Sequence, residues 1–255
     1  MKKILFPIVL LLAFVGCNRT KNLNEVDVEP YSLIDSVFIE SEYGEDYAYY
    51  SVNADLPVTK NDSLRNNILH WMLSDNTEDY TTYFQNEKDR FFTEEGDEPR
   101  SALQSNYTLS EQTDAYVTYI SEGYVYTGGA HPIPWYYGTT FSKLDGSILS
   151  YDLFDSSVFD APEQLIGLIS DNIRSQYFDK INNEEEEYLF EPNAILPFPT
   201  NHPWIETDSL VFCYQPYEIA PYSAGMPLCK IAINDLKPYL SEKGKSLLLN
   251  STIQQ

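Results

Sequence analysis

Two glycine- and proline-punctuated stretches decide how this chain folds: Tyr126-Thr-Gly-Gly-Ala-His-Pro132 and Phe212-Cys-Tyr-Gln-Pro-Tyr-Glu-Ile-Ala-Pro-Tyr-Ser-Ala-Gly225. Each lies beside an aromatic-rich segment that alternates as a β-strand does. Gly128 and Gly129 can adopt backbone angles that other residues resist, and Pro132 prevents a helix from following. The two stretches are therefore predicted to be well-defined loops. Each is either a binding site or a tight turn that only connects strands.

Alternating and helical patterns of apolar residues fill the rest of the chain. Strands are predicted over residues 34–40, 47–56, 102–110, 115–127, 136–141, 147–151, 209–214 and 228–233. Helices are predicted to begin at Asn61 or Asp62, within residues 76–79 and at Asp160, and a last helix is expected over residues 235–240. These elements predict an α+β fold in which several helices pack on a mostly antiparallel sheet.

The order of the elements predicts two successive subdomains. The acidic loop at residues 94–99 favours a join between an N-terminal subdomain of residues 31–100 and a C-terminal subdomain of residues 101–243. Residues 244–255 are expected to be a tail. Glu184–Glu187 is a run of four acids that we expect to be solvated.

The N-terminus has the pattern of a secretory signal. Lys2 and Lys3 precede an apolar run, Ile4–Val15, that is too short to span a bilayer. The segment Phe14-Val-Gly-Cys17 resembles a bacterial lipobox. This resemblance implies that residues 1–16 are a lipoprotein signal peptide and that Cys17 is lipidated. An ordinary secretory signal is the alternative.

A lipid on Cys17 would attach the protein to a membrane of the cell envelope. Each buried methylene contributes about 0.8 kcal/mol, so several acyl chains give firm anchoring. Residues 17–30 are polar and are predicted to be a tether. No acidic cluster follows Cys17 directly, which favours the outer membrane and its periplasmic face.

The formal net charge of −23 restricts the partners that the chain can attract. Such a field repels nucleic acid and anionic membrane surfaces, and it attracts cationic proteins. We therefore expect no nucleic-acid partner. Solubility alone is the simpler explanation of the charge.

The two loops supply the candidate binding residues, which are Gly128, Gly129, His131, Trp135, Tyr217, Glu218 and Tyr222. His131 and Glu218 could form a pair that moves a proton or orients a ligand, or each could fix its own turn by bonding to the backbone. The sequence has no metal-ligand spacing, phosphate loop, dinucleotide fingerprint or nucleophile elbow. We therefore expect no catalytic residue, no cofactor and no metal.

Cys213 and Cys229 lie on the two strands that flank the second loop. In an oxidising compartment they form a disulfide if they face each other closely. Two buried free thiols are the alternative.

The order of motifs resembles a known family. The Gly-Gly-Ala-His-Pro motif is followed by an alternating strand, the turn Leu144-Asp-Gly146, Tyr151-Asp-Leu-Phe154, a helix and the second loop. This order is similar to the RsiV-like domain of unknown function, which is found in lysozyme-sensing anti-sigma factors and beside the catalytic domain of some peptidoglycan deacetylases. The resemblance covers roughly residues 107–240, and residues 31–100 more weakly resemble the PdaC-type domain that often precedes it.

The resemblance gives two hypotheses of function. The first is a non-enzymatic envelope lipoprotein that binds lysozyme or another basic muramidase. A lipid anchor in place of the sensors' transmembrane helix makes direct signalling across a membrane unexpected. The alternative is a peptidoglycan- or glycan-binding module, or an accessory to an envelope hydrolase, in which Tyr126, Trp135, Tyr136 and Tyr137 stack on sugar rings. An enzyme of an unrecognised type ranks third.

Overall fold

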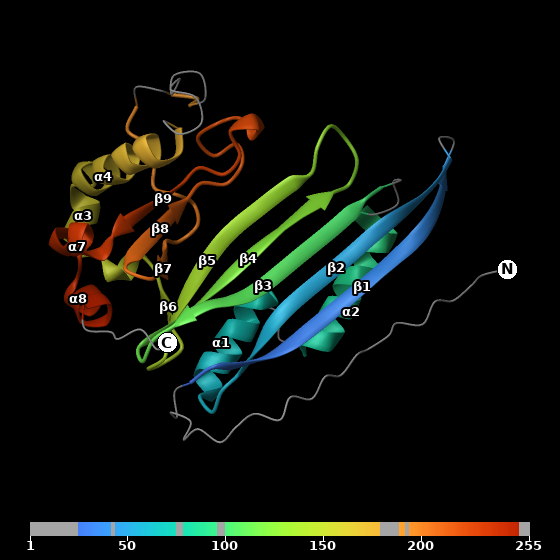
Figure 1. Ribbon diagram of the computed structural model, residues 1–255, viewed down its shortest axis with the longest axis horizontal. Coiled ribbons are helices and arrows are strands. Elements are labelled where there is room, and N and C mark those ends of the chain that lie inside the picture. The colour runs from blue at the N-terminus through green and yellow to red at the C-terminus, as the bar shows by residue number, and fades with distance from the viewer. Residues whose placement is uncertain are drawn as a thin grey trace.

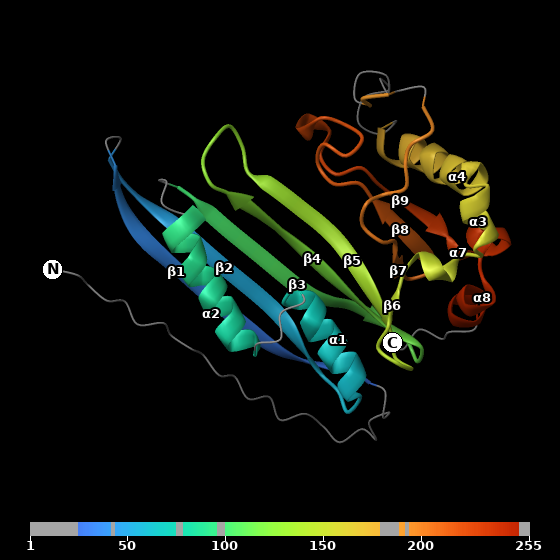
Figure 2. The ribbon, with the colours of Figure 1, turned by 180° about the vertical axis from the view of Figure 1, so that it is seen from behind.

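The computed structural model describes residues 25–41, 44–74, 79–95, 100–178, 189–191 and 194–249. Within these residues the chain forms two sheets, one of six strands in the order β1-β2-β3-β4-β5-β6 and one of three strands in the order β7-β8-β9 (Figure 1). Helices cover one face of the large sheet, and the small sheet lies at the opposite end from the β1 edge (Figure 2). The predicted α+β class with a mostly antiparallel sheet is confirmed.

The large sheet is built from long strands. Its members are β1 (Asp27–Ser41), β2 (Gly44–Val58), β3 (Ala102–Gln112), β4 (Tyr116–Tyr126), β5 (Ile133–Ser142) and β6 (Ile148–Leu149). All neighbouring pairs are antiparallel except β2 and β3, which are parallel. A parallel pair needs a crossover connection, and the helices α1 (Asp62–Met72) and α2 (Tyr80–Arg90) with the π-helical turn η1 (Phe91–Glu95) supply it.

Both crossover helices begin where the sequence predicts. The Asn61 side chain accepts a hydrogen bond from the backbone N–H of Leu64, which makes it the N-cap of α1. Its amide group also donates to the carbonyl of Lys143, so the same residue ties α1 to the turn after β5. Asp79 caps α2 in the same way through Thr82.

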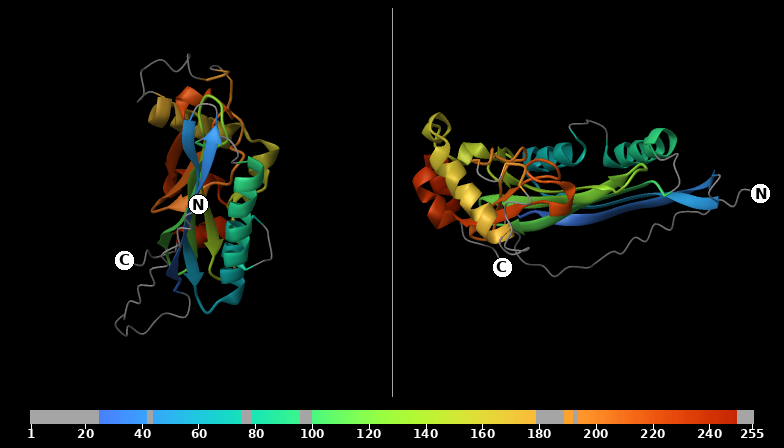
Figure 3. Two further views of the ribbon diagram at one scale, coloured as in Figure 1. Left: turned by 90° about the vertical axis from the view of Figure 1, so that its right-hand side faces the viewer. Right: turned by 90° about the horizontal axis from the view of Figure 1, so that it is seen from above.

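The helices bury one face of the sheet. Leu64, Ile68 and Met72 of α1 pack on Val117, Tyr119 and Phe141 of β4 and β5. Phe84 of α2 and Phe91 pack on Tyr50 and Val52 of β2. Figure 3 shows the two helices on the same side of the strands. The alternation of β2 therefore has a physical cause, because every second side chain meets a helix.

The second sheet packs on the other face, at β4 and β5. It consists of β7 (Trp204–Glu206), β8 (Ser209–Cys213) and β9 (Leu228–Ala232), and all its pairs are antiparallel. The short elements around it are η2 (Tyr151–Leu153), α3 (Ser157–Asp160), α4 (Glu163–Ile173), η3 (Arg174–Phe178), η4 (Tyr222–Ala224), α7 (Ile233–Leu236), η5 (Lys237–Tyr239) and α8 (Glu242–Leu249).

Two buried threonines join the sheets. The hydroxyl of Thr118 donates to the carbonyl of Ile205 at 3.0 Å, and that of Thr140 accepts from the N–H of Ile205 at 2.9 Å. These bonds satisfy the outer backbone groups of the edge strand β7, which would otherwise be buried without partners. The indole of Trp204 lies on the backbone of Gly138, where any side chain would overlap it.

Several expectations need correction. β1 begins at Asp27, inside the predicted tether, because Val26 is buried and its backbone N–H and carbonyl bond the Gln112 side chain. α4 begins at Glu163 with Pro162 as its N-cap, so Asp160 does not cap it and instead ends α3. The predicted last helix is divided into α7 and η5.

Three further regions bear on the predicted boundaries. The expected tail contains most of α8, where the backbone of Gly244 approaches the carbonyl of Leu153 too closely for a side chain. The large sheet continues across residue 100, the predicted join between subdomains, and that boundary stays a prediction. Residues 1–24, with Cys17, and Glu184–Glu187 lie outside the described residues.

Candidate functional site

The two loops singled out in the sequence meet in the structure. His131 follows β4, and Tyr217 and Tyr222 lie between β8 and β9. The rings of His131 and Tyr222 stack with 3.6 Å between their centroids and 16° between their planes. The hydroxyl of Tyr217 lies 3.0 Å from Nε2 of His131. We call these three residues the loop cluster.

The first loop holds the imidazole of His131 in a defined tautomer. Gly128 and Gly129 have φ values of 100° and 97°, and the hydroxyl of Tyr126 donates to the carbonyl of Gly129 at 2.9 Å. Nδ1 of His131 lies 3.1 Å from the carbonyl oxygen of Pro132, which can only accept. In the neutral ring Nδ1 therefore carries the proton, and Nε2 accepts from the Tyr217 hydroxyl.

Tyr217 is held in an unusual backbone conformation. Its φ is 69°, in the left-handed region that bulky residues rarely adopt, and its side chain is 50% exposed. A strained residue that presents an aromatic ring to solvent is a reason to look for a function at that position. The loop ends after η4 at Gly225, which has a φ of 73°.

Glu218 is part of the scaffold of the second loop. Its carboxylate accepts from the N–H of Gln215 at 2.8 Å and from the N–H of Thr200 at 2.6 Å. Among the described residues His131 has Tyr217 as its side-chain hydrogen-bond partner, and no bond joins His131 to Glu218. The sequence left two roles open for Glu218, a pair with His131 or bonds to the backbone that fix its own turn. The structure shows the second role.

The side chain of Gln215 fastens the second loop to β5. Its amide donates to the carbonyl of Tyr136 at 2.9 Å, and its oxygen accepts from the N–H of Tyr136 at 3.3 Å. Both backbone groups of one residue on the edge of the sheet are thus satisfied by a single side chain. This attachment sets the position of Tyr217 relative to the first loop.

Trp135 lies apart from the loop cluster. Its indole N–H donates to the hydroxyl of Ser121 at 3.2 Å, and its ring covers Gly123 on the neighbouring strand. Within the described part of the chain no ring contact joins Trp135 to His131, Tyr217 or Tyr222. The structure thus brings three of the candidate side chains together and leaves this one against the sheet.

Cys213 and Cys229 are buried free thiols. Phe212 pairs with Cys229 and Cys213 pairs with Leu228, so the two cysteines point to opposite faces of the small sheet. Cys213 packs with Trp204, whereas Cys229 faces α4. Burial raises the pKa of each thiol to about 12.

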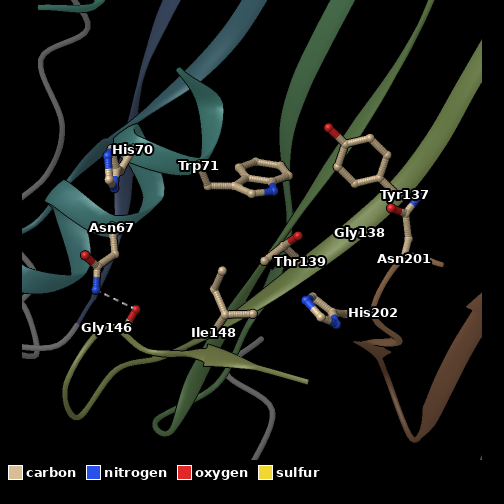
Figure 4. A pocket seen from close by; sticks show the side chains of 10 residues that line it. All are labelled: Asn67, His70, Trp71, Tyr137, Gly138, Thr139, Gly146, Ile148, Asn201 and His202. Carbon is tan, nitrogen blue, oxygen red and sulfur yellow. Dashed lines mark hydrogen bonds between the residues drawn. The ribbon is translucent and has the colours of Figure 1, made fainter. Parts of the chain in front are cut away.

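Sequence reasoning missed a cavity of about 470 Å³ beside β5. It is lined by Asn67, His70, Trp71, Tyr137, Gly138, Thr139, Gly146, Ile148, Asn201 and His202 (Figure 4). These residues come from α1, from β5, from β6 and the turn before it, and from the segment before β7. Two lining residues gave a signal in the sequence: Tyr137 was among the aromatic residues proposed to stack on sugar rings, and His70 lies beside the apolar stripe of α1, where a lone histidine favours packing or exposure. The lining residues are too far apart in the chain to form a motif.

Two other features of the described residues belong here. In that part of the chain, no group of three or more His, Cys, Asp or Glu side chains is arranged to hold a metal ion. None of the helices that the structure describes has the length and apolar character needed to cross a membrane.

The fold and the loop cluster define an α+β protein with a helix-covered sheet and a smaller sheet that carries the cluster. Comparison with family models finds two matched segments. Residues 44–134 match the PdaC family, described as deacetylase PdaC, and residues 151–234 match DUF3298, described as a protein of unknown function. The chain is therefore similar to the PdaC family over its first matched segment and to DUF3298 over its second.

Two crystal structures of DUF3298 family members have the same fold. One, from Bacteroides fragilis, is 16% identical, covers 89% of this chain and 98% of its own, and superposes with a TM-score of 0.71. The other, from Pseudomonas aeruginosa PAO1, is 18% identical, covers 87% of this chain and 97% of its own, and has a TM-score of 0.61. A search of curated proteins finds no match to this chain.

Proposed function

We propose that this chain is a non-enzymatic binding protein of the cell envelope, anchored by a lipid on Cys17, and that its loop cluster docks a cationic protein of the lysozyme type. The observation that carries the proposal is the presentation of Tyr217. Its ring is half exposed, and the hydroxyl is fixed by His131 in the opposite loop. Exposed tyrosines that are already ordered lose little entropy on binding and are enriched in protein interfaces.

The charge of the chain supports a basic partner. A net charge of −23 raises the rate of encounter with a cationic protein and disfavours anionic competitors. The resemblance of the loop motifs to lysozyme-sensing proteins makes a basic muramidase the first partner to test. In this proposal the charge supplies the attraction, and the loop cluster supplies the contact surface.

The experiment compares two exposed tyrosines. Binding of the full chain to lysozyme is measured by calorimetry for the wild type, Tyr217→Ala and Tyr47→Ala. Tyr47 is 58% exposed on β2, so the two substitutions remove the same group and leave the charge unchanged. We expect Tyr217→Ala to weaken binding at least tenfold, because removing a central aromatic contact typically costs about 2 kcal/mol or more. Equal affinities for the two variants would reject the loop cluster as the docking surface.

A glycan-binding function through Trp135 has less support. Its indole N–H is bonded to Ser121, and its ring rests on Gly123, so one face of the ring is covered and cannot stack on a sugar. A saccharide ligand is favoured by a different part of the molecule, the cavity beside β5.

A further inference from the structure

The cavity beside β5 is separate from the loop cluster. Asn67, His70 and Trp71 of α1 lie on one side of it, and Asn201 and His202 lie on the other (Figure 4). It is thus formed where the helix-covered sheet meets the segment that leads into the small sheet. Junctions of this kind are common ligand sites, and the volume of about 470 Å³ falls within the usual range of roughly 300–1,000 Å³.

The lining combines polar and apolar surface and carries no fixed charge. Two carboxamides, two imidazoles, a phenol and a threonine hydroxyl face the cavity, and no Asp, Glu, Lys or Arg is among the residues that line it. A phosphate or carboxylate ligand would call for Arg or Lys at the site. In a chain in which 22% of the residues are charged, a lining of this kind favours a neutral ligand that forms many hydrogen bonds.

Trp71 gives the cavity a rigid aromatic wall. Its ring makes edge-to-face contacts with Tyr107, Tyr119, Tyr137 and Phe141 at centroid distances of 5.7, 6.5, 6.1 and 5.9 Å. The planes of Trp71 and Tyr137 are 89° apart, so they do not form the parallel slot that would hold a flat heterocycle. The C–H face of a sugar ring can instead pack on one aromatic wall while its hydroxyls reach the other side.

Hydrogen-bonding groups surround this wall. The amide of Asn67 donates to the carbonyl of Gly146 at 3.0 Å, which orients the side chain and leaves its oxygen as an acceptor. Neither the Asn201 carboxamide nor the Tyr137 hydroxyl forms a hydrogen bond with another residue that the structure describes. These groups can both donate and accept, which is what a ligand rich in hydroxyls requires.

We propose that this cavity is a binding site for a neutral saccharide. One sugar ring packs against Trp71, and its hydroxyls or amides bond Asn67, Tyr137 and Asn201. The site goes beyond the proposed docking function, because none of the loop-cluster residues lines it. The protein would then hold a glycan and a cationic protein on two separate surfaces.

The test is a calorimetric titration of the full chain with three uncharged probes. Chitotriose and cellotriose are neutral saccharides with and without N-acetyl groups, and adenosine is a flat heterocycle. The variants are Asn201→Ala in the cavity, with His131→Ala in the loop cluster as the control. Asn201 is only half buried and makes no hydrogen bond with the described residues, so its replacement should leave the fold intact. Thermal unfolding of both variants checks this point.

We expect saturable binding of at least one saccharide, weakened about tenfold by Asn201→Ala and unchanged by His131→Ala. Lysozyme binding should follow the opposite pattern, so the two proposals can fail independently. Absence of saturable binding by both saccharides, equal affinities of wild type and Asn201→Ala, or preferential binding of adenosine would overturn the saccharide site.

Discussion

The hydroxyl of Tyr217 lies 3.0 Å from Nε2 of His131, although the two residues are 86 positions apart in the sequence. This bond and the stacking of His131 on Tyr222 join the loop after β4 to the loop between β8 and β9. The contact links the large sheet to the small one at the molecular surface. A ligand that binds there contacts one loop from each sheet.

The backbone at Tyr217 should store strain that glycine relieves. At a φ of 69° any residue with a Cβ is disfavoured by roughly 1–2 kcal/mol. We therefore expect the free energy of unfolding, measured by urea denaturation, to be about 1 kcal/mol higher for Tyr217→Gly than for Tyr217→Ala. Both variants lose the ring, so both should bind lysozyme at least tenfold more weakly than the wild type. An alanine variant as stable as the glycine variant would show that the loop relaxes out of this conformation.

The junction between the sheets depends on the absence of a side chain at residue 138. A Cβ there would overlap the indole of Trp204, which is 1% exposed. We expect Gly138→Ala to lower the free energy of unfolding by about 2–4 kcal/mol through overpacking and loss of the close approach.

The matched control for that variant is Gly167→Ala in α4. A Cβ at Gly167 meets no atom within 4 Å, and alanine is favoured over glycine in a helix by about 0.5–1 kcal/mol. This variant should therefore be slightly more stable than the wild type. If both substitutions had the same effect in a chemical denaturation series, the packing of Trp204 on Gly138 would not be the cause.

Lys143 should make stability depend on pH in the alkaline range. Burial lowers its pKa from 10.5 to about 8, an effect only partly offset by the nearby acids Asp114 and Glu25. Between these two values the unfolded chain binds the proton and the folded chain does not, so stability rises with pH in that window. The expected gain between pH 7.5 and 9.5 is about 1–2 kcal/mol.

The comparison with Lys143→Met isolates this effect. Burial raises the pKa values of Tyr116, Tyr119 and Tyr214 and of the Cys213 and Cys229 thiols. These groups therefore lower stability as pH rises, and they do so equally in the wild type and in Lys143→Met. The difference in unfolding free energy between wild type and variant should therefore shift in favour of the wild type as pH rises. A difference that is constant from pH 7.5 to 9.5 would contradict a neutral buried Lys143.

The two cysteines should titrate as free thiols. They point to opposite faces of the small sheet, and a pKa of about 12 keeps both protonated in the folded protein. Denaturation without reductant should make Cys213 and Cys229 reactive toward an alkylating reagent, whereas alkylation of both at pH 8 should be slow before unfolding. Peptide mapping that finds neither Cys213 nor Cys229 alkylated in the unfolded, unreduced chain would establish a disulfide and reject this arrangement.

Local signals predicted most of the fold. Asn61 was predictable as the N-cap of α1, because a short polar side chain directly before an apolar helical stripe typically accepts a hydrogen bond from a backbone N–H of the first turn. The turn at Asp145-Gly146 formed as expected, with Gly146 at a φ of 77°. β7 was missed because a three-residue strand has no detectable alternation, and the bonds from Thr118 and Thr140 that complete it come from distant strands.

The site was predictable only in part. Glycine and proline spacing identified both loops, and His131, Tyr217 and Tyr222 do lie together. The sequence could not show that Glu218 bonds the backbone of its own loop, because that depends on where Thr200 is placed. It could not indicate the cavity either, since Trp71 and Asn201 are brought together only by the packing of the two sheets.

The most direct test of the central claim is a titration of the full chain with lysozyme at low and at physiological salt. Bulk attraction by a charge of −23 is strongly screened at 0.15 M salt, where the Debye length is about 8 Å, whereas a docked aromatic contact is not. We expect saturable binding at both salt concentrations, with Tyr217→Ala weaker at both. Binding that disappears at physiological salt would mean that the charge alone attracts a basic protein, and it would contradict a specific docking surface at the loop cluster.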